Sequence, residues 1–253
     1  MQCPGQDSRY WDGAAVFDTK CPECGGGVEF FKDDNTRKCG SCGYRLLNPR
    51  MDFGCASYCP YAEQCLGELP PELLSKKQDL LKDRSAIEMK KYFGTDFRRI
   101  GHATRVARYV EEIGGLVMVD AQTGSDFNPA VAGIAAYLHD IGIKEAERKH
   151  QSSSPQYQHQ EGPVVARDIL SSLQANEGLI DEVCDIIGHH HLPRATETMN
   201  FKVLYDADLI TNLEEKQKDA PSPRIHLEKI VDRSFLTREG ALVAARVLLD
   251  ENK

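Results

Sequence analysis

The two residue types best suited to binding transition metals occupy separate parts of this 253-residue chain. Eight of the nine cysteines lie before Leu66, whereas none of the eight histidines lies before His102. Thiolate and imidazole are favoured ligands for different metals and different sites. The segregation therefore predicts two metal chemistries in two structural parts. We expect a cysteine-rich module over 1–66, a linker over 67–84 and a second domain over 85–253.

The second domain has the pattern of an all-helical bundle. Apolar residues recur at close to the helical period between Phe97 and Val110. Further helices are expected over 129–139, 162–173, 179–189, 201–215 and 238–250, with glycines and prolines between them. The polar segment 151–160 is expected to be a mobile loop. The predicted fold class is mainly α, an all-helical bundle preceded by a small cysteine-rich β module.

The cysteine-rich module contains two Cys-x-x-Cys pairs, each followed directly by a glycine. The pairs are Cys21/Cys24 and Cys39/Cys42, and their spacing is close to that of four-cysteine zinc sites. This segment resembles a zinc ribbon and predicts one structural Zn²⁺. The other four thiols of the module could hold a second Zn²⁺ or an iron–sulfur cluster, or remain free; they are Cys3, Cys55, Cys59 and Cys65.

A histidine followed at once by an aspartate ends the most apolar predicted helix. Burying His139 beside Asp140 is costly unless something pairs with both side chains. At a helix end the two can converge on one point, and a divalent cation there would offset the cost. Other polar residues also interrupt or end apolar helical patterns: His102, His159, His189, His190, His191, Asp206 and Asp208.

Four segments in this order resemble the HD-domain superfamily of metal-dependent phosphohydrolases. They are "HATRVARYV", "LHDIGIK", "IIGHHHLP" and "DADLITNL", and the resemblance covers about residues 85–250. It implies that one metal is held by His102, His139, Asp140 and Asp208, with Asp208 preferred over Asp206. It also implies that Lys144 lies near the phosphate. Asp140 or a nearby carboxylate can orient the metal-bound water.

Dinuclear members of that superfamily have further histidine ligands. Here His190 or its neighbour His189 could serve, and His159 lies one residue from the family position, which is Gln158. One or two metals are therefore both open. The mixed histidine and carboxylate set suits Mn²⁺, Fe²⁺, Co²⁺ or Ni²⁺ better than Mg²⁺.

Charge and hydropathy narrow the possible partners. The net charge of −8 and the sequence pI of about 5.5 argue against a nucleic acid or an anionic membrane as partner. No apolar run approaches the length of a membrane helix, and the start of the chain lacks a signal-peptide pattern, so we expect a cytoplasmic protein.

We predict a phosphohydrolase that acts on a phosphorylated small molecule, a nucleotide or another phosphate ester. Two alternatives stay open. One is an HD-fold oxygenase with two irons, and the other is a metal-containing sensing or binding protein that uses the ribbon as its interaction module.

Overall fold

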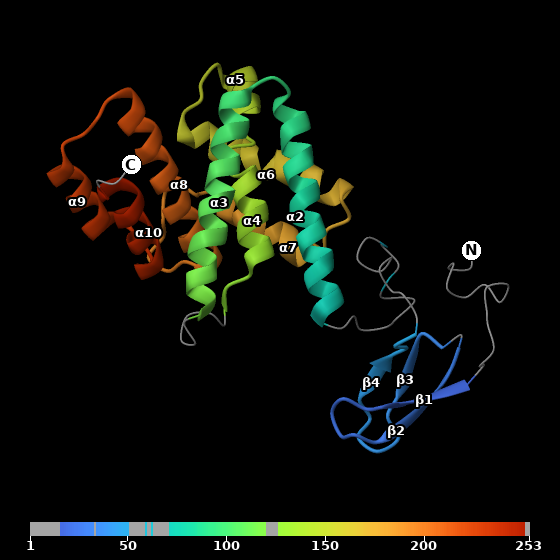
Figure 1. The fold of residues 1–253 in the computed structure, drawn as a ribbon. Helices are drawn as coiled ribbons and strands as arrows, with labels where there is room; N and C mark the ends of the chain where they lie inside the picture. Colours follow the sequence, from blue (N-terminus) through green and yellow to red (C-terminus); the bar gives the residue numbers. More distant parts are fainter. Residues whose placement is uncertain are drawn as a thin grey trace. The chain divides into compact units, whose positions relative to one another are not determined.

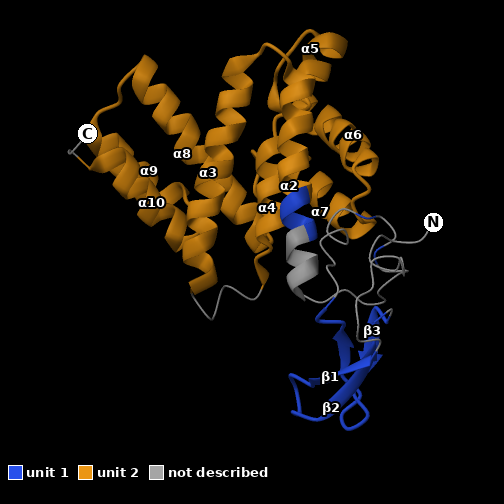
Figure 2. Cartoon of the chain, turned by 45° about the vertical axis from the view of Figure 1, so that its right-hand side comes forward, with its two compact units in different colours: residues 1–80 blue, residues 81–253 orange. Residues whose placement is uncertain are grey.

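The computed structural model describes residues 16–32, 34–50, 59, 62, 71–119 and 126–250. For residues 71–76 it describes the backbone alone. The chain divides into two compact units, 1–80 and 81–253, which are described separately (Figure 2). The predicted fold class is confirmed, since a small strand region precedes a helical domain (Figure 1).

The first unit is built from two antiparallel hairpins. Strand β1 (Val16–Lys20) pairs with β2 (Gly27–Phe31), and β3 (Thr36–Lys38) pairs with β4 (Arg45–Leu47). Among the described residues of this unit, one small apolar cluster includes two cysteines: it consists of Phe17, Cys21, Val28, Phe30, Cys39 and Leu46. A core of this size stabilises a fold weakly on its own, which favours additional support from a bound metal.

The second unit consists of helices, the first of which begins within the residues of the first unit. They are α2 (Pro71–Phe93), α3 (Phe97–Val119), α4 (Pro129–Leu138), α5 (Ile143–His150), α6 (Pro155–Ser172), α7 (Glu177–Ile187), α8 (Met199–Asp219), α9 (Arg224–Ser234) and α10 (Arg238–Leu249). Across the described part of the chain, no helix combines the length and apolarity that a membrane span needs.

The loop predicted over 151–160 is wrong for its second half. Helix α6 begins at Pro155, a residue that favours the first helical turn, and includes the polar run that follows. That run has no apolar periodicity because two of its buried positions carry polar side chains, Gln158 and Glu161. The helix therefore begins about two turns earlier than the apolar pattern indicates.

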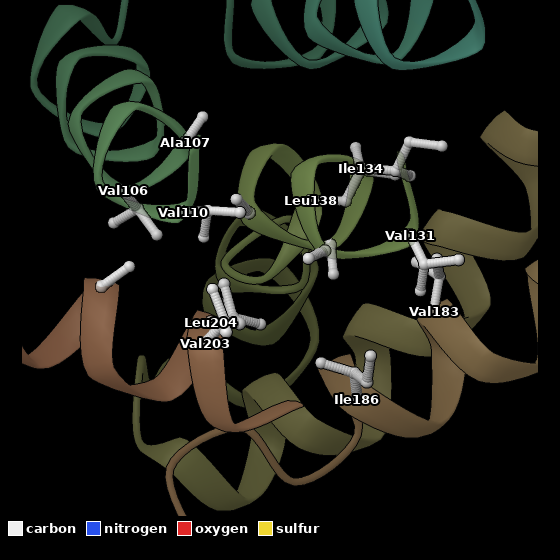
Figure 3. Packing of buried hydrophobic residues seen from close by; sticks show 14 of the residues in the cluster. Val106, Ala107, Val110, Val131, Ile134, Leu138, Val183, Ile186, Val203 and Leu204 are labelled. Atoms are coloured by element: carbon white, nitrogen blue, oxygen red, sulfur yellow. The ribbon is translucent and has the colours of Figure 1, made fainter. Parts of the chain in front are cut away.

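Helix α4 forms the centre of the helical domain and positions its most important turn. Every residue from Ala130 to Leu138 except Tyr137 is buried, because α3, α7 and α8 all pack against this helix (Figure 3). Ile134 and Leu138 are among the completely buried side chains. A helix that is apolar on all sides is one that is covered on all sides. His139 and Asp140 follow it directly and are therefore held at the centre of the bundle.

Candidate metal centre

Histidine and aspartate side chains from five parts of the helical domain converge on one region. His102 comes from α3, His139 and Asp140 follow α4, His159 comes from α6, His190 and His191 follow α7, and Asp208 comes from α8. They form three overlapping groups, and within each group one ligand atom per residue lies within 4.8 Å of the others.

The first group contains His102, His139 and Asp208, all of which are buried. The Nε2 atom of His102 lies 3.0 Å from Oδ1 of Asp208 and 3.3 Å from Nε2 of His139. The Nε2 atom of His139 also lies 3.6 Å from Oδ1 of Asp208. Two imidazole nitrogens and a carboxylate oxygen that face one another in this way are a donor set for a transition metal.

The second group contains His139, Asp140 and His190, and its Asp140 connects the first group to the third. The Oδ2 atom of Asp140 lies 3.5 Å from Nε2 of His139 and 3.8 Å from Nε2 of His102. Its Oδ1 atom lies on the other side, 3.7 Å from Nε2 of His190. The two oxygens of one carboxylate therefore face two different sets of histidines.

The third group contains His159, His190 and His191. The Nε2 atom of His159 lies 3.1 Å from Nδ1 of His191. The His190 ring is 2% exposed; its Nδ1 atom donates to the carbonyl oxygen of Ile187 at 2.8 Å, and its Nε2 atom is buried without a hydrogen-bond partner. An orphaned buried acceptor costs free energy unless a ligand meets it. A divalent metal beside Nε2 of His190 would supply the missing partner, so these histidines fit a bound divalent metal.

The charges of the first group and of Asp140 hold one another in their ionised forms. Burial raises the pKa of Asp140 and of Asp208, but the neighbouring histidines outweigh it and hold both pKa values below their usual range. Burial opposes protonation of His139, but the charges of Asp140 and Asp208 outweigh it and raise its pKa to about 9. By contrast, burial and the charge of His190 lower the pKa of His159 and of His191 to about 4.

Free carbonyls at helix ends orient two of the ligand rings. The Nδ1 atom of His139 donates to the carbonyl oxygen of Ala136 at 2.9 Å, just as His190 uses Ile187. The last four carbonyls of a helix have no partner within the helix, so a histidine that follows the helix can use one. Each ring thereby turns its Nε2 atom toward the cluster.

Three residues considered from the sequence lie elsewhere. His189, predicted as a ligand, instead pairs with the carbonyl oxygen of Asp185 at 2.6 Å and with Oε1 of Glu197 at 3.0 Å. Lys144 donates to the carbonyl oxygen of Tyr92 at 2.8 Å. Asp206 accepts hydrogen bonds from residues 236 and 237 at the start of α10.

His191 lies in the cluster, whereas the sequence named only His190 or its neighbour His189 as possible further ligands. Sequence reasoning missed it because consecutive residues at a helix end point in different directions, and a run of three histidines does not show which two turn inward. Asp208 lies in the cluster whereas Asp206 does not, and His159 lies in the cluster although it is one residue from the family position.

A hollow of about 350 Å³ opens beside the cluster. His102 and Asp140 form part of its wall, and the other lining residues are mostly polar or charged: Asp96, Arg98, Arg99, Ile143, Ser153, Gln158, Asn212 and Glu215. Arg98 and Arg99 add two guanidinium groups to the wall, and Arg99 pairs with Asp96 at 3.0 Å and with Glu147 at 2.5 Å. Nothing in the sequence pattern singled these arginines out, because they precede His102 on an ordinary amphipathic helix.

The four cysteines of the two Cys-x-x-Cys pairs also come together. The Sγ atoms of Cys21 and Cys42 are 3.6 Å apart, as are those of Cys24 and Cys39. Gly25 and Gly43 have φ values of +71° and +75°, a backbone conformation that favours glycine and that closes each turn around the thiols. Backbone N–H groups of Cys42 and Ser41 lower the pKa of the Cys39 thiol to about 6.

The proposed second cysteine site cannot be placed in the same way. Cys3, Cys55 and Cys65 lie outside the described residues, and Cys59 is half-buried. That site stays a prediction from the sequence.

A four-cysteine module and a helical domain with a histidine–aspartate cluster together define a class of metal-binding protein. The family model described as "HD domain" matches residues 99–234, more than half of the chain, and the chain therefore belongs to the HD domain family. Membership implies divalent metal binding and, at the level of the superfamily, metal-dependent hydrolysis.

Among solved structures, the chain is similar to a predicted HD superfamily hydrolase from an uncultured Thermotogales bacterium. The two are 20% identical, and the match covers 66% of this chain and 83% of that chain with a TM-score of 0.44. No curated protein matches the chain.

Proposed function

We propose that this protein is a phosphohydrolase that uses two divalent transition-metal ions. The observation that carries the proposal is the position of Asp140, whose two oxygens face separate sets of histidines. The first ion would be held by His102, His139, Asp208 and one oxygen of Asp140. The second would be held by the other oxygen of Asp140 with His159, His190 and His191.

Hydrolysis of a phosphate ester follows from such a pair. Bound divalent ions polarise a phosphoryl oxygen and lower the pKa of bound water. The ionised Asp140 carboxylate faces the hollow and can orient the attacking water by accepting its hydrogen bond. Arg98 lines the same hollow and can neutralise part of the charge of the phosphoryl group, whereas Arg99 is paired with Asp96 and Glu147.

The hollow also supports a small substrate. Its volume of about 350 Å³ is at the lower end of the range for small-molecule sites. Its walls offer amide, hydroxyl, guanidinium and carboxylate groups, which suits a phosphate with a hydroxylated leaving group. We propose a nucleotide or another phosphate ester of similar size.

The test is metal-dependent hydrolysis with two ligand variants and one control. Metal-stripped protein is reloaded with Mn²⁺, Fe²⁺, Co²⁺ or Ni²⁺ and assayed on p-nitrophenyl phosphate, its diester and nucleotides. His139→Ala and Asp140→Ala should abolish hydrolysis, whereas His226→Ala, which changes an exposed histidine on α9, should retain it. Hydrolysis by metal-free Asp140→Ala at the wild-type rate would contradict the proposal.

The complete set of histidines also favours a second candidate, a dinuclear-iron oxygenase. Iron-loaded protein would then consume O₂ with an added substrate and would not hydrolyse any phosphate ester. Oxygen consumption measured beside the hydrolysis panel separates the two functions.

We also propose that the four clustered cysteines hold a structural Zn²⁺. The paired thiols and the positive φ of Gly25 and Gly43 support this site. Zinc would supplement the small core of the first unit.

A further inference from the structure

The hydrogen-bond partner available to His102 differs from that of two other proposed ligands, His139 and His190. His102 lies in the middle of α3, where the helix uses its own carbonyls for backbone hydrogen bonds. His139 and His190 follow helix ends and can donate Nδ1 to free carbonyls. His102 must therefore find a side chain to accept the hydrogen on its Nδ1 atom.

That acceptor is Glu215. The Nδ1 atom of His102 lies 3.0 Å from Oε1 of Glu215, and the Nε2 atom lies 3.0 Å from Oδ1 of Asp208. Both acids belong to α8 and are seven residues apart, which places them on one face about two turns apart. The ring is thus held between two carboxylates of a single helix.

Glu215 is itself held in place. Arg105, one turn after His102 on α3, forms an ion pair with the same Oε1 atom. This pairing offsets part of the negative charge of Glu215, which also lines the hollow next to the cluster. Glu215 is half-buried and has no contact with the other ligand histidines among the described residues.

We propose that Glu215 is a positioning residue for the metal centre: it fixes the orientation of the His102 ring and increases the donor strength of its Nε2 atom. A carboxylate that accepts from the remote nitrogen of a ligand histidine selects one tautomer and makes the metal-facing nitrogen more basic. The inference rests on the proposed role of His102 as a ligand. It goes beyond that role because it assigns a function to an acid that does not bind the metal.

Neighbouring glutamates on α8 provide a matched test. Glu214 accepts from the hydroxyl of Tyr109 at 2.8 Å and contacts no ligand residue, so Glu214→Gln is the control. The affinity for Mn²⁺ and Co²⁺ is measured by chelator competition for wild type, Glu215→Gln, Glu215→Leu, Glu214→Gln and His102→Ala. Melting temperatures of the metal-free proteins are recorded in parallel.

Glu215→Leu should weaken metal binding about 10- to 100-fold, the range found when outer partners of ligand histidines are removed. Glu215→Gln should fall between wild type and Glu215→Leu, because the amide oxygen still accepts from Nδ1 but carries no charge. Glu214→Gln should bind as wild type does. If Glu215→Leu does not fold, the intermediate affinity of Glu215→Gln relative to Glu214→Gln carries the test.

Two results separate the possible failures. Normal affinity in Glu215→Gln and Glu215→Leu, together with weak binding in His102→Ala, overturns the positioning role alone. Normal affinity in His102→Ala overturns the ligand assignment and the proposed function with it. Equal loss in Glu214→Gln and Glu215→Gln also overturns the inference, since the effect would then belong to α8 in general.

Discussion

Asp206 and Asp208 are two residues apart on α8. Substitution of Asp206 should lower the stability of the fold, whereas substitution of Asp208 should lower the metal affinity. Asp206 is completely buried and accepts hydrogen bonds from the backbone N–H groups of Leu236 and Thr237 and from the Thr237 hydroxyl, at 2.8, 2.9 and 2.6 Å. The Thr237 hydroxyl in turn accepts from the N–H of Gly240 and begins α10. Asp206 therefore holds α10 against α8.

The magnitude follows from the donors that lose their acceptor. Asp206→Ala leaves the buried N–H and hydroxyl of Thr237 unsatisfied, at about 1–3 kcal/mol each, so the free energy of unfolding should fall by roughly 4 kcal/mol. Metal stoichiometry should be unchanged. Asp208→Asn keeps the size of the side chain but loses a ligand charge, so metal affinity should fall more than about 100-fold.

The assay combines urea unfolding in the presence of a chelator with elemental analysis of the reloaded proteins. The chelator removes the stabilisation that bound metal would add to the folded state. Asp206→Ala with depleted metal and normal stability, or Asp208→Asn with full metal occupancy, would refute the reasoning.

Three further predictions follow from other parts of the structure. Gly142→Ala should destabilise the fold by about 1–3 kcal/mol in urea unfolding and lower metal occupancy, because the added Cβ would lie 2.5–2.7 Å from backbone atoms of Gln158 and Gly162, next to His159; unchanged stability would contradict this packing. Zinc removal should abolish hydrogen-exchange protection in β1–β4 while α4 stays protected, and equal protection before and after removal would argue against a structural zinc. Metal binding at the first group should release a proton below pH 9, because the pKa of His139 is raised to about 9 and the metal needs neutral imidazole. The metal affinity should therefore rise up to about tenfold per pH unit between pH 6 and 8. Titration calorimetry in buffers of different ionisation enthalpy should detect the released proton.

Local patterns in the sequence determined the class of this protein. Each Cys-x-x-Cys pair forms a tight turn that ends in a glycine, and this local pattern can be read in the sequence at Cys21/Cys24 and Cys39/Cys42. The apolar run before His139 predicted a buried helix, because a run of apolar side chains is a local sequence signal for burial on all sides. The ordered histidines and aspartates then indicated the HD family, which the family model confirms.

Only the tertiary structure decided which side chains meet and what holds them. His191 faces the cluster and His189 does not, because the chain leaves the helical geometry after α7 and the periodicity no longer predicts direction. Helix α6 brings His159 into the cluster from a run of polar residues whose burial the sequence does not show. The pairing of Glu215 with His102 joins residues 113 apart in the chain, and such a contact depends on how α3 packs against α8. Sequence pattern records which groups are available, whereas packing sets their direction and their partners.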